Sequence, residues 1–496
     1  MVADFFLLVP VLFPVLMGLC LALIPALDRK GARKAIISIT LVGNALLVLP
    51  VLLSPDLEQP LFRLSENLPV FLHSDATGKC FAALISVVWC LAGFYSFEYM
   101  EHEGHLKRFY GFYLATLGIL IGLCFAGSII TYYMFYELMT LLTVPLVMHT
   151  MDKEAVAAGI KYLIYSVLGA SLVLLGIFIL SRYVQSFSFA AGGQLNTDAM
   201  AGHETTVLAA SMLMILGFGT KAGMFPLHGW LPTAHPVAPA PASAVLSGII
   251  TKAGVLGIIR VIYFLVGCRH LAGTWVQTAF MCLTLFTIFS GSLLAYKENL
   301  LKKRLAYSSV SQVSYVLFGL STMSPLGFAG ALLHVCAHSL IKDTLFMTAG
   351  AIIHKTGKTR TSELDGIGKQ MPVTMWCFTL VSVGLVGIPP CLGFVSKWYL
   401  AQGSLSSVVV PGILRVLGPV VLLISALLTA GYLLSVSIHG FFPGKTSSEP
   451  ADVLEKAEPT WVMLVPMILL TTLSIVLGIF PGSMISLFQS IAGSLM

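Results

Sequence analysis

The chain has 496 residues, of which 57% are hydrophobic and only 10% are charged, and its mean hydropathy is +0.92. Soluble proteins carry about 25% charged residues, so this composition excludes a soluble enzyme and a soluble domain held by a single anchor. The net charge of +6 is modest, and its distribution along the chain is more informative than its size.

Apolar runs that could cross a bilayer recur along the whole chain. A membrane helix needs about 17–25 apolar residues, and this criterion predicts roughly 14 spans. No polar stretch between them is long enough to fold alone, so the expected fold class is all-α and polytopic. The first span has no cleavage site after it and is interpreted as a retained helix rather than a signal peptide. The predicted spans are residues 5–25, 35–53, 79–99, 109–127, 129–149, 160–181, 207–225, 242–266, 273–295, 305–322, 327–353, 372–400, 412–441 and 460–488.

Basic residues cluster in the loops that follow the odd-numbered spans. The positive-inside rule places such loops in the cytoplasm, so both termini are expected outside. The clusters comprise Arg29, Lys30, Arg33, Lys34, Lys107, Arg108, Lys297, Lys302, Lys303, Arg304, Lys355, Lys358, Arg360 and Lys369. The loops after the even-numbered spans hold only Arg63, Lys79, Arg182, Arg269 and Arg415.

The nine cysteines stand singly within the spans. They show neither a CxxC motif nor the spacing of cluster ligands, and the simplest interpretation is small buried side chains. We therefore expect no iron–sulfur cluster, nickel, haem or other cofactor in this chain.

Two of the predicted spans are interrupted by helix-breaking residues. The seventh runs on as LGFGTKAGMFPLHGWLPTAHPVAPAPAS, with Pro226, Pro232 and Pro236, and the twelfth contains Gly387 with Pro389–Pro390. Proline cannot continue a regular helix, and non-helical backbone at membrane depth is tolerated only inside protein or beside a wet cavity. Paired interrupted spans in corresponding halves point to a transport site.

The order of the spans predicts an internal repeat. Each of two five-helix units has its interrupted helix fourth, and an odd number of spans makes the units inverted with respect to each other. The expected organisation is flanking helices at 1–108, a first repeat at 109–266, a second repeat at 273–441 and a C-terminal helix at 442–496.

Five ionisable residues lie inside predicted spans. A charge at the bilayer centre costs about 2.5–3.5 kcal/mol, so five facing lipid would cost on the order of 12–18 kcal/mol, whereas a whole domain is stabilised by about 5–15 kcal/mol. They must therefore face one another or water inside the bundle. They are Glu137, Lys221, Lys252, Lys342 and Lys397.

The lysines suit proton transfer because desolvation makes an ammonium release its proton more readily, whereas arginine stays charged. Glu137 is interpreted as a carboxylate that modulates a lysine across the bundle, with a structural ion pair as the alternative. For Lys221 and Lys397 the alternative is snorkelling to the interface. Arg260, nearer the end of its span, is interpreted as a snorkelling residue.

A polar stripe is expected on the eleventh span. His334, His338 and Lys342 follow one another at spacings of four residues, which stacks them on one helix face. Histidine titrates near neutral pH and suits a relay; a metal site is the alternative, although no third ligand is evident. Asp343 points about 100° away from Lys342.

These motifs together resemble the antiporter-like subunits of respiratory complex I, of multi-subunit cation/proton antiporters and of energy-converting membrane-bound hydrogenases. The resemblance covers nearly the whole chain, and the wording HGWL and HPVAPAPAS is most similar to the hydrogenase and formate hydrogenlyase branch. It rests on YELMT, TKAGMFPLHGWLPTAHPVAPAPASAVLSG, TKAG, HVCAHSLIKDTLF and GIPPCLGFVSKW.

The resemblance implies roles for particular residues. Glu137 and Lys221 match the family's Glu–Lys pair and Lys252 its central lysine, while Lys397 matches the terminal lysine. His334 and His338 match the relay between halves. His228 and His235, in the first break, could line an access path or cap the half-helices. The family commonly has an aspartate where this chain has Thr233.

The expected function is proton translocation, or Na⁺/H⁺ exchange, by a non-catalytic subunit of a multi-subunit complex in a prokaryotic inner membrane. The resemblance implies related membrane subunits and a soluble redox arm with iron–sulfur and nickel–iron subunits as partners; no nucleic acid is expected. The alternatives are a redox-free cation/proton antiporter, a self-sufficient carrier for an organic solute, a quinone-handling subunit and a structural scaffold.

Overall fold

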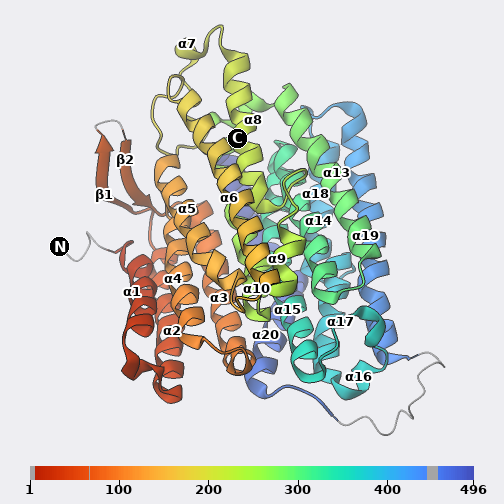
Figure 1. The fold of residues 1–496 in the computed structure, drawn as a ribbon. Coiled ribbons are helices and arrows are strands. Elements are labelled where there is room, and N and C mark those ends of the chain that lie inside the picture. Colours follow the sequence, from red (N-terminus) through yellow and green to blue (C-terminus); the bar gives the residue numbers. More distant parts are fainter. Residues whose placement is uncertain (1–5, 66–67, 444–455) are drawn as a thin grey trace.

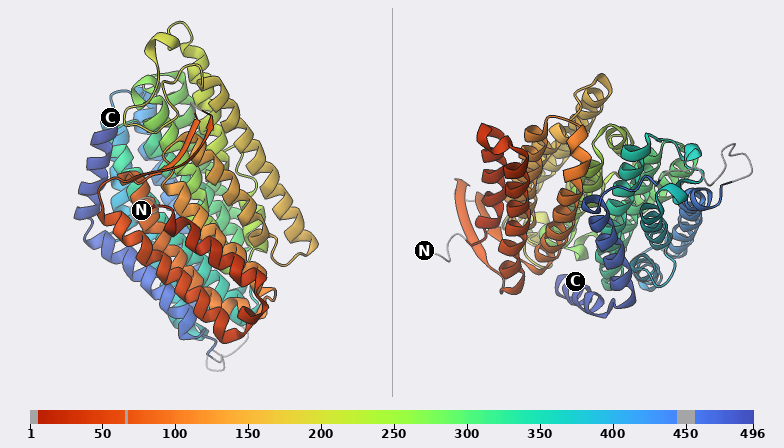
Figure 2. Two further views of the ribbon diagram at one scale, coloured as in Figure 1. Left: turned by 90° about the vertical axis from the view of Figure 1, so that its left-hand side faces the viewer. Right: turned by 90° about the horizontal axis from the view of Figure 1, so that it is seen from below.

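The computed structural model describes residues 6–65, 68–443 and 456–496. The described residues are 78% helical and form an elongated bundle of roughly parallel helices (Figures 1 and 2). The all-α character expected from the apolar runs is confirmed. The α-helices are α1 (Val9–Leu23), α2 (Lys30–Leu53), α3 (Ala76–Tyr99), α4 (Leu106–Cys124), α5 (Ile129–Val147), α6 (Lys153–Leu180), α7 (Thr197–Met200), α8 (Glu204–Ala222), α9 (Leu231–Val237), α10 (Ala240–Val245), α11 (Thr251–Ile259), α12 (Cys268–Leu271), α13 (Trp275–Lys297), α14 (Leu301–Ser321), α15 (Pro325–Thr356), α16 (Ile367–Gln370), α17 (Pro372–Val386), α18 (Leu392–Ser406), α19 (Gly412–Phe441), α20 (Trp461–Ile479) and α21 (Gly482–Leu495).

Shorter elements join these helices. Two π-helical segments, η4 (Leu246–Ile250) and η5 (Arg260–Val266), flank α11, and three 3₁₀ turns are η2 (Pro25–Asp28), η3 (Met100–His102) and η6 (Thr361–Glu363). Strands β1 (Glu58–Ser65) and β2 (Leu68–His73) pair antiparallel.

The protein is a polytopic membrane protein. Within the described residues, ten helical segments are long and apolar enough to cross a bilayer. The helices α14 and α15 have 21 and 32 residues and are not among the ten; they carry much of the polar interior described below.

A β-hairpin that the sequence analysis did not predict lies between the second and third predicted spans. Its two strands are short, each contains a proline, and their register shifts twice. These features remove the alternation that identifies a strand. The hairpin extends from one side of the bundle near α5 (Figure 1).

The segment predicted as a single last span, 460–488, is two helices. The first, α20, ends at Ile479, and α21 begins at Gly482 after Pro481. Proline at this position prevents continuation of the helix. Helix α20 packs against α3 and α15, so it joins the N-terminal and C-terminal parts of the bundle.

The helical chain is interrupted at the two predicted breaks. Helix α8 ends at Gly223, which has φ +78°, and α17 ends at Gly387, which has φ +93°. Both values lie in the left-handed region that glycine adopts without strain. Cis peptide bonds precede Pro226 and Pro390 in the two breaks. The chain resumes as α9 and α10 after the first break and as α18 after the second.

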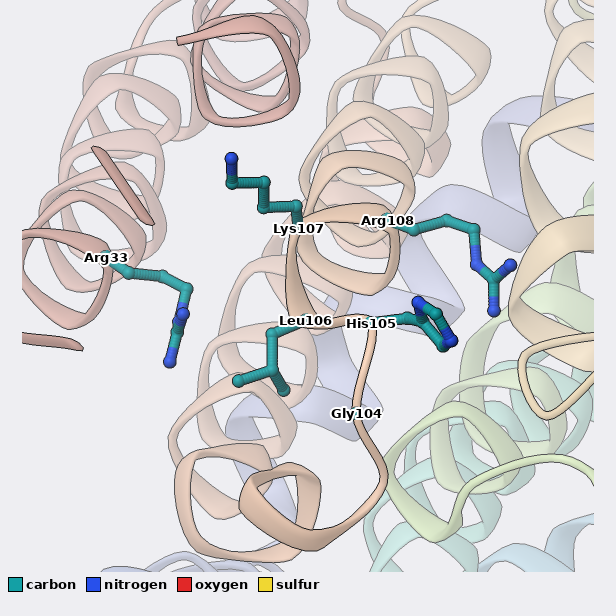
Figure 3. Close-up of a pocket in the computed structure, with 6 residues that line it drawn as sticks. All are labelled: Arg33, Gly104, His105, Leu106, Lys107 and Arg108. Carbon is teal, nitrogen blue, oxygen red and sulfur yellow. The ribbon is translucent and has the colours of Figure 1, made fainter. Parts of the chain in front are cut away.

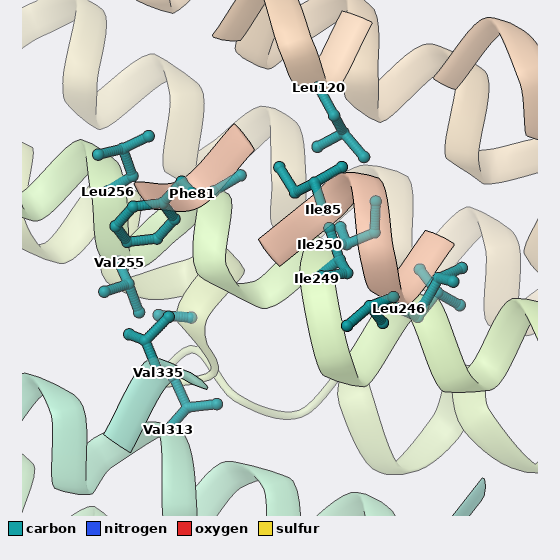
Figure 4. Close-up of a cluster of buried hydrophobic side chains, with 14 of the residues drawn as sticks. Phe81, Ile85, Leu120, Leu246, Ile249, Ile250, Val255, Leu256, Val313 and Val335 are labelled. Carbon is teal, nitrogen blue, oxygen red and sulfur yellow. The ribbon is translucent and has the colours of Figure 1, made fainter. Parts of the chain in front are cut away.

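The central part of the bundle is the segment from α10 to η5, residues 240–266. Every residue of its apolar window is buried, because α3, α5, α8, α14 and α15 surround it. Its cluster of apolar side chains includes Leu246, Ile249 and Ile250 packed near Ile85 and Leu120 (Figure 4).

Arg260 corrects another expectation. It is fully buried rather than snorkelling, it forms an ion pair with Asp75 at the start of α3, and its guanidinium lies 4.8 and 4.6 Å from the rings of Phe189 and Phe264. Lys302 was assigned to a basic loop, yet it is nearly buried on α14 and donates to the carbonyl oxygen of Ala238 at 2.9 Å.

The loops after odd-numbered spans meet at one end of the bundle. Lys30 and Lys34 pair with Glu101 at 3.0 and 2.7 Å, and Lys355 pairs with Glu98 at 2.8 Å. The two described chain ends lie with the other set of loops, because the amides of Leu7 and Leu8 donate to Gln59 and Arg269 donates to Met496.

Candidate functional site

A line of buried polar side chains runs through the bundle from α5 and α8 to α18. Five of the residues expected to carry function are almost fully buried, with exposures of 0–2%: Lys221, Lys252, His334, His338 and Lys342. Glu137 and Lys397 are partly buried. These five side chains therefore lie inside the bundle.

Lys221 sits in the last turn of α8, just before the first break. Its ammonium donates at 2.9 Å to each of three hydroxyl groups, those of Thr140, Tyr162 and Ser166. The ring of Tyr162 also lies 4.4 Å from Nζ. Because α5 supplies Thr140 and α6 supplies Tyr162 and Ser166, this amine joins three helices.

Glu137 lies on α5, about one helical turn before Thr140. Its Oε1 has no hydrogen-bond partner among the described residues, and the hydrogen bonds of Lys221 go to hydroxyls instead of this carboxylate. Thr140, which accepts from Lys221, belongs to the same helix α5 as Glu137. The arrangement is therefore a nearby carboxylate and amine without a direct ion pair.

Lys252 makes the contact that joins the two halves of the line. Its Nζ lies 2.6 Å from Nδ1 of His338 on α15 and donates to the carbonyl oxygen of Ser247 at 2.7 Å. Ser247 belongs to the π-helical segment η4, where the i→i+4 hydrogen-bond pattern of an α-helix is interrupted. The irregular turn thus supplies a backbone oxygen to the amine.

His334 continues the line one turn from His338, at 6.3 Å between ring centroids. Its Nδ1 lies 2.9 Å from the hydroxyl of Ser396 on α18, and its ring stacks on Tyr315 at 5.2 Å. The spacing of four residues between the histidines thus places one ring toward α11 and the other toward α18.

Lys397 lies next to Ser396, beyond the second break. Its ammonium donates to the carbonyl oxygens of Leu385 and Val386 at 2.6 and 2.8 Å. These are among the last carbonyls of α17, which have no partner within their own helix. Nζ also lies 5.0 Å from the ring of Tyr315, so Tyr315 lies between His334 and Lys397.

Lys342 starts a branch of hydroxyl groups. It donates to the hydroxyl of Ser308 at 2.6 Å and to the carbonyl oxygen of Leu305 at 3.1 Å. Ser308 in turn lies 2.7 Å from the hydroxyl of Tyr432, which lies 3.2 Å from that of Thr429. The branch therefore runs from α15 through α14 to α19.

The two histidines of the first break have different surroundings. His235 is fully buried, stacks on Phe346 at 4.6 Å, and neither ring nitrogen has a partner among the described residues. His228 is partly buried beside Phe225. Thr233 accepts a hydrogen bond from Lys161 at 3.0 Å and donates to the carbonyl oxygen of Gly229.

Several buried polar atoms beside this line lack protein partners in the described chain. They include Nε2 of His334, Nε2 of His338 and both amide atoms of Gln312. Buried polar groups in native proteins are almost always hydrogen-bonded, to ordered water where protein groups do not reach. Unpaired atoms next to the amines are thus suited to hold water molecules along the line.

Two surface pockets lie away from this line. One of about 440 Å³ lies at the helix ends and is lined by Arg33, His105, Lys107 and Arg108 with Gly104 and Leu106 (Figure 3). Metal-ligating side chains do not gather in groups of three or more anywhere in the described residues. His334 and His338 instead each contact a group on another helix.

Sequence reasoning missed the neutral partners of the amines. Tyr162 and Ser166 have a spacing of four residues and so share one face of α6, which was a usable signal. Ser396 directly precedes Lys397 and also went unnoticed. Serine and tyrosine are common in membrane helices, so only the position of a lysine on another helix distinguishes these residues.

The fold and the buried line define a membrane antiporter-like subunit. Residues 126–424 match the family NADH:quinone oxidoreductase/Mrp antiporter, transmembrane, and the chain belongs to this family. It is 33% identical over 388 residues to NADH-quinone oxidoreductase subunit N of Desulforudis audaxviator, covering 76% of this chain and 75% of that relative. The expected family is therefore confirmed.

Two further similarities agree with this assignment. Hydrogenase-4 component B of Escherichia coli is 31% identical over 425 residues, which cover 82% of this chain and 62% of that relative. A chain in the structure of the Mrp complex from Dietzia sp. superposes with a TM-score of 0.84 at 19% identity, covering 100% of this chain and 98% of that chain. The second similarity shows a shared fold.

Proposed function

We propose that this chain translocates protons across a prokaryotic inner membrane as one subunit of a multi-subunit complex. The observation that carries the proposal is the direct contact between Lys252 and His338, 2.6 Å apart and both buried, at the junction of the two halves. A lysine and a histidine can each gain and lose a proton, so the contact is competent for transfer.

The proposed path follows the order of the contacts. A proton loads onto Lys221, whose affinity for it depends on Glu137, and moves to Lys252. It then crosses by way of His338 and His334 to the neighbourhood of Lys397. The branch through Lys342 offers a second route toward α19, while His228 and His235 are candidates for the access path at the first break.

The inverted-repeat organisation belongs to the proposal as well. The first unit would comprise residues 109–266 and the second 273–441, within a total of roughly 14 spans. The support is that α6 packs on the interrupted helix α8, just as α15 packs on the interrupted pair α17 and α18. Lys221 stands in the last turn before the first break, and Lys397 binds the carbonyls at the second.

Partners are proposed from the relatives. One relative is named as a subunit of a quinone oxidoreductase, another as a hydrogenase component, and a third comes from an Mrp complex. We infer that this chain likewise assembles with other membrane subunits and is driven by redox chemistry in a soluble arm. No cofactor is proposed for the chain itself.

Substitution of either central lysine tests the function. Lys221→Ala and Lys252→Ala should each abolish proton uptake into inside-out vesicles while the complex still assembles, as judged by co-purification of its subunits. Lys297→Ala, at an exposed lysine, is the control and should pump normally. Retained pumping in either buried-lysine variant would overturn the proposal.

The competing functions give different results in the same system. A redox-free cation/proton antiporter would acidify vesicles only when a Na⁺ gradient is imposed, and would co-purify without redox subunits. A self-sufficient carrier would be active as the purified chain alone in liposomes. Proton uptake into the vesicles that requires the partner subunits and continues without a Na⁺ gradient supports the proposal.

A further inference from the structure

One fully buried carboxyl group plays no part in the path described so far. Asp343 follows Lys342 on α15, its exposure is 0%, and neither carboxylate oxygen has a hydrogen-bond partner among the described residues. An isolated ionised carboxylate in a low-dielectric interior costs far more free energy than a neutral carboxyl. Such a group persists only with a nearby cation, a water molecule or a proton.

The carboxyl group of Asp343 occupies the space where a side chain at position 248 would lie, and residue 248 is a glycine. A Cβ atom added at Gly248, in the π-helical segment η4, would lie 1.7 Å from Oδ1 of Asp343. Ser339, one turn earlier on α15, donates to the carbonyl oxygen of the same glycine at 2.6 Å. Ser339 and Asp343 therefore fix one face of α15 against η4, beside the face that carries His338 and Lys342.

Lys252 is the cation that segment η4 holds beside this carboxyl. The carboxyl lies against Gly248, and the ammonium donates to the carbonyl oxygen of Ser247, the residue before it, so adjacent residues of η4 contact the two groups. Lys342 is directed to α14 instead. Tyr113 of α4 is a further titratable group in this part of the bundle, and its hydroxyl donates to the carbonyl oxygen of Trp89.

Apolar side chains pack around segment η4. Segment η4 packs on α3 as well as on α15, and Leu246, Ile249 and Ile250 of η4 gather with Ile85 of α3 and Leu120 of α4 (Figure 4). In such a medium a carboxylate and an ammonium that form together cost much less than either charge alone.

We propose that Asp343 is a proton-binding carboxyl of the central part of the path and that it shares one proton with Lys252. No hydrogen bond joins these two described residues directly, so the proton passes through one intervening water molecule. The O–H bond of the carboxyl breaks as the water accepts that proton, the water gives up one of its own protons, and an N–H bond forms at Nζ, which leaves a carboxylate and an ammonium. The reverse transfer restores two neutral groups, so the unit has no net charge in either state. Asp343 would then modulate the proton affinity of Lys252, as Glu137 is proposed to do for Lys221. Unlike Glu137, Asp343 belongs to the other proposed repeat from its lysine.

Infrared difference spectroscopy of the full-length chain in lipid bilayers tests this proposal without requiring transport. The wild type should show the carbonyl stretching band of a protonated carboxyl, changing with pH, and Asp343→Asn should lack it. In Lys252→Met the carboxyl has no amine to receive its proton, so the band should persist across the pH range. ¹³C-labelled aspartate should shift the band without any substitution.

A spectrum in which the labelled wild type has no protonated-aspartate band, or in which Asp343→Asn leaves that band unchanged, overturns the proposal. Asp365→Asn, at an exposed loop carboxylate, is the matched control and should leave the spectrum unaltered. The inference rests on the proposed function, but the two can fail separately. If the infrared bands are as expected and the wild-type complex does not pump protons, the proposed function is wrong and the assignment of Asp343 stands.

Transport in the assembled complex gives a second readout. Without the Asp343 carboxylate, Lys252 holds its proton less strongly, so the pH dependence of pumping in Asp343→Asn should move toward acid by about one pH unit, the scale at which two groups count as coupled. An unshifted profile in an assembled Asp343→Asn complex would contradict a shared proton. A uniform loss of rate without a shift would indicate a structural role and likewise count against the proposal.

Discussion

Lys221 shows how a buried amine can be held without a carboxylate in direct contact. Its three acceptors are neutral hydroxyls that can accept a hydrogen bond from the ammonium or donate one to the neutral amine. A direct Glu–Lys pair would favour the charged form strongly. Hydroxyl partners with a carboxylate at longer range leave both protonation states accessible, as a relay requires.

Removal of one hydroxyl tests this arrangement. Tyr162→Phe keeps the ring 4.4 Å from Nζ but deletes one acceptor, and hydrogen bonds to charged groups are worth about 1.5–3 kcal/mol. We expect pumping to fall by about tenfold or more, equivalent to about 1.4 kcal/mol, with assembly retained. Tyr165→Phe, one turn away on α6, is the control. Equal rates in the two variants, measured as proton uptake by vesicles, would show that the hydroxyl is dispensable.

At the level of single residues, the sequence identified the amines and the histidines but not their contacts. Charges at membrane depth are conspicuous because they are costly, so Lys252 and His338 could be selected without a structure. Their distance of 2.6 Å joins residues 86 positions apart and depends on the packing of α11 against its neighbours. Arg260 was misassigned because its partner, Asp75, lies in another part of the chain.

Among the elements, the start of α3 and the segment around η5 form a fixed junction. Asp75 accepts from Arg260 and also caps α3 by accepting from the amide of Gly78 at 2.7 Å. Arg260 has 0% exposure, and its guanidinium also donates to the carbonyl oxygen of Cys124 at 3.5 Å. The junction thus ties α3 and the end of α4 to the segment that carries Lys252.

Loss of this junction should be costly. Asp75→Ala leaves a buried guanidinium without its carboxylate, and breaking a buried pair costs about 3–5 kcal/mol. Asp56→Ala, which removes an exposed partner of Lys79, should cost about 1 kcal/mol or less. Thermal unfolding of the two variants in detergent should therefore differ clearly. Similar transition temperatures would refute the importance of the Arg260 pair.

The helix breaks could be predicted because glycine and proline act locally, whatever the tertiary structure. The π-helical segments η4 and η5 could not, since nothing in LSGII or RVIYFLV departs from an apolar helix. Their irregularity depends on tertiary contacts, such as Lys252 with Ser247 and Ser339 with Gly248. The β-hairpin was missed for the related reason that its strands are short and irregular.

For the molecule as a whole, the distribution of basic residues predicts its orientation. The loops with most Lys and Arg meet at one end, near Glu98 and Glu101, and the end with α7 holds few basic residues. The positive-inside rule therefore predicts that the first end is cytoplasmic, and on this basis we propose that the two described chain ends lie outside.

Labelling with a membrane-impermeant thiol reagent tests this orientation. In a Cys282→Ser background, which removes the exposed native thiol, Asp198→Cys on α7 should react in intact cells, whereas Lys369→Cys on α16 should react only after the cells are opened. Both positions are exposed, so accessibility from each side decides the result. The reverse pattern would invert the proposed topology.

The central claim is that the buried amines carry protons, and the most direct measurement is proton uptake by the reconstituted complex bearing Lys252→Arg. Arginine keeps the positive charge but does not release its proton at any relevant pH. If Lys252 were needed only for its charge, the arginine variant would therefore still take up protons. We expect an assembled complex with normal driving chemistry and no proton uptake, while Lys303→Arg behaves as the wild type. Proton uptake at the wild-type rate in Lys252→Arg would contradict the account.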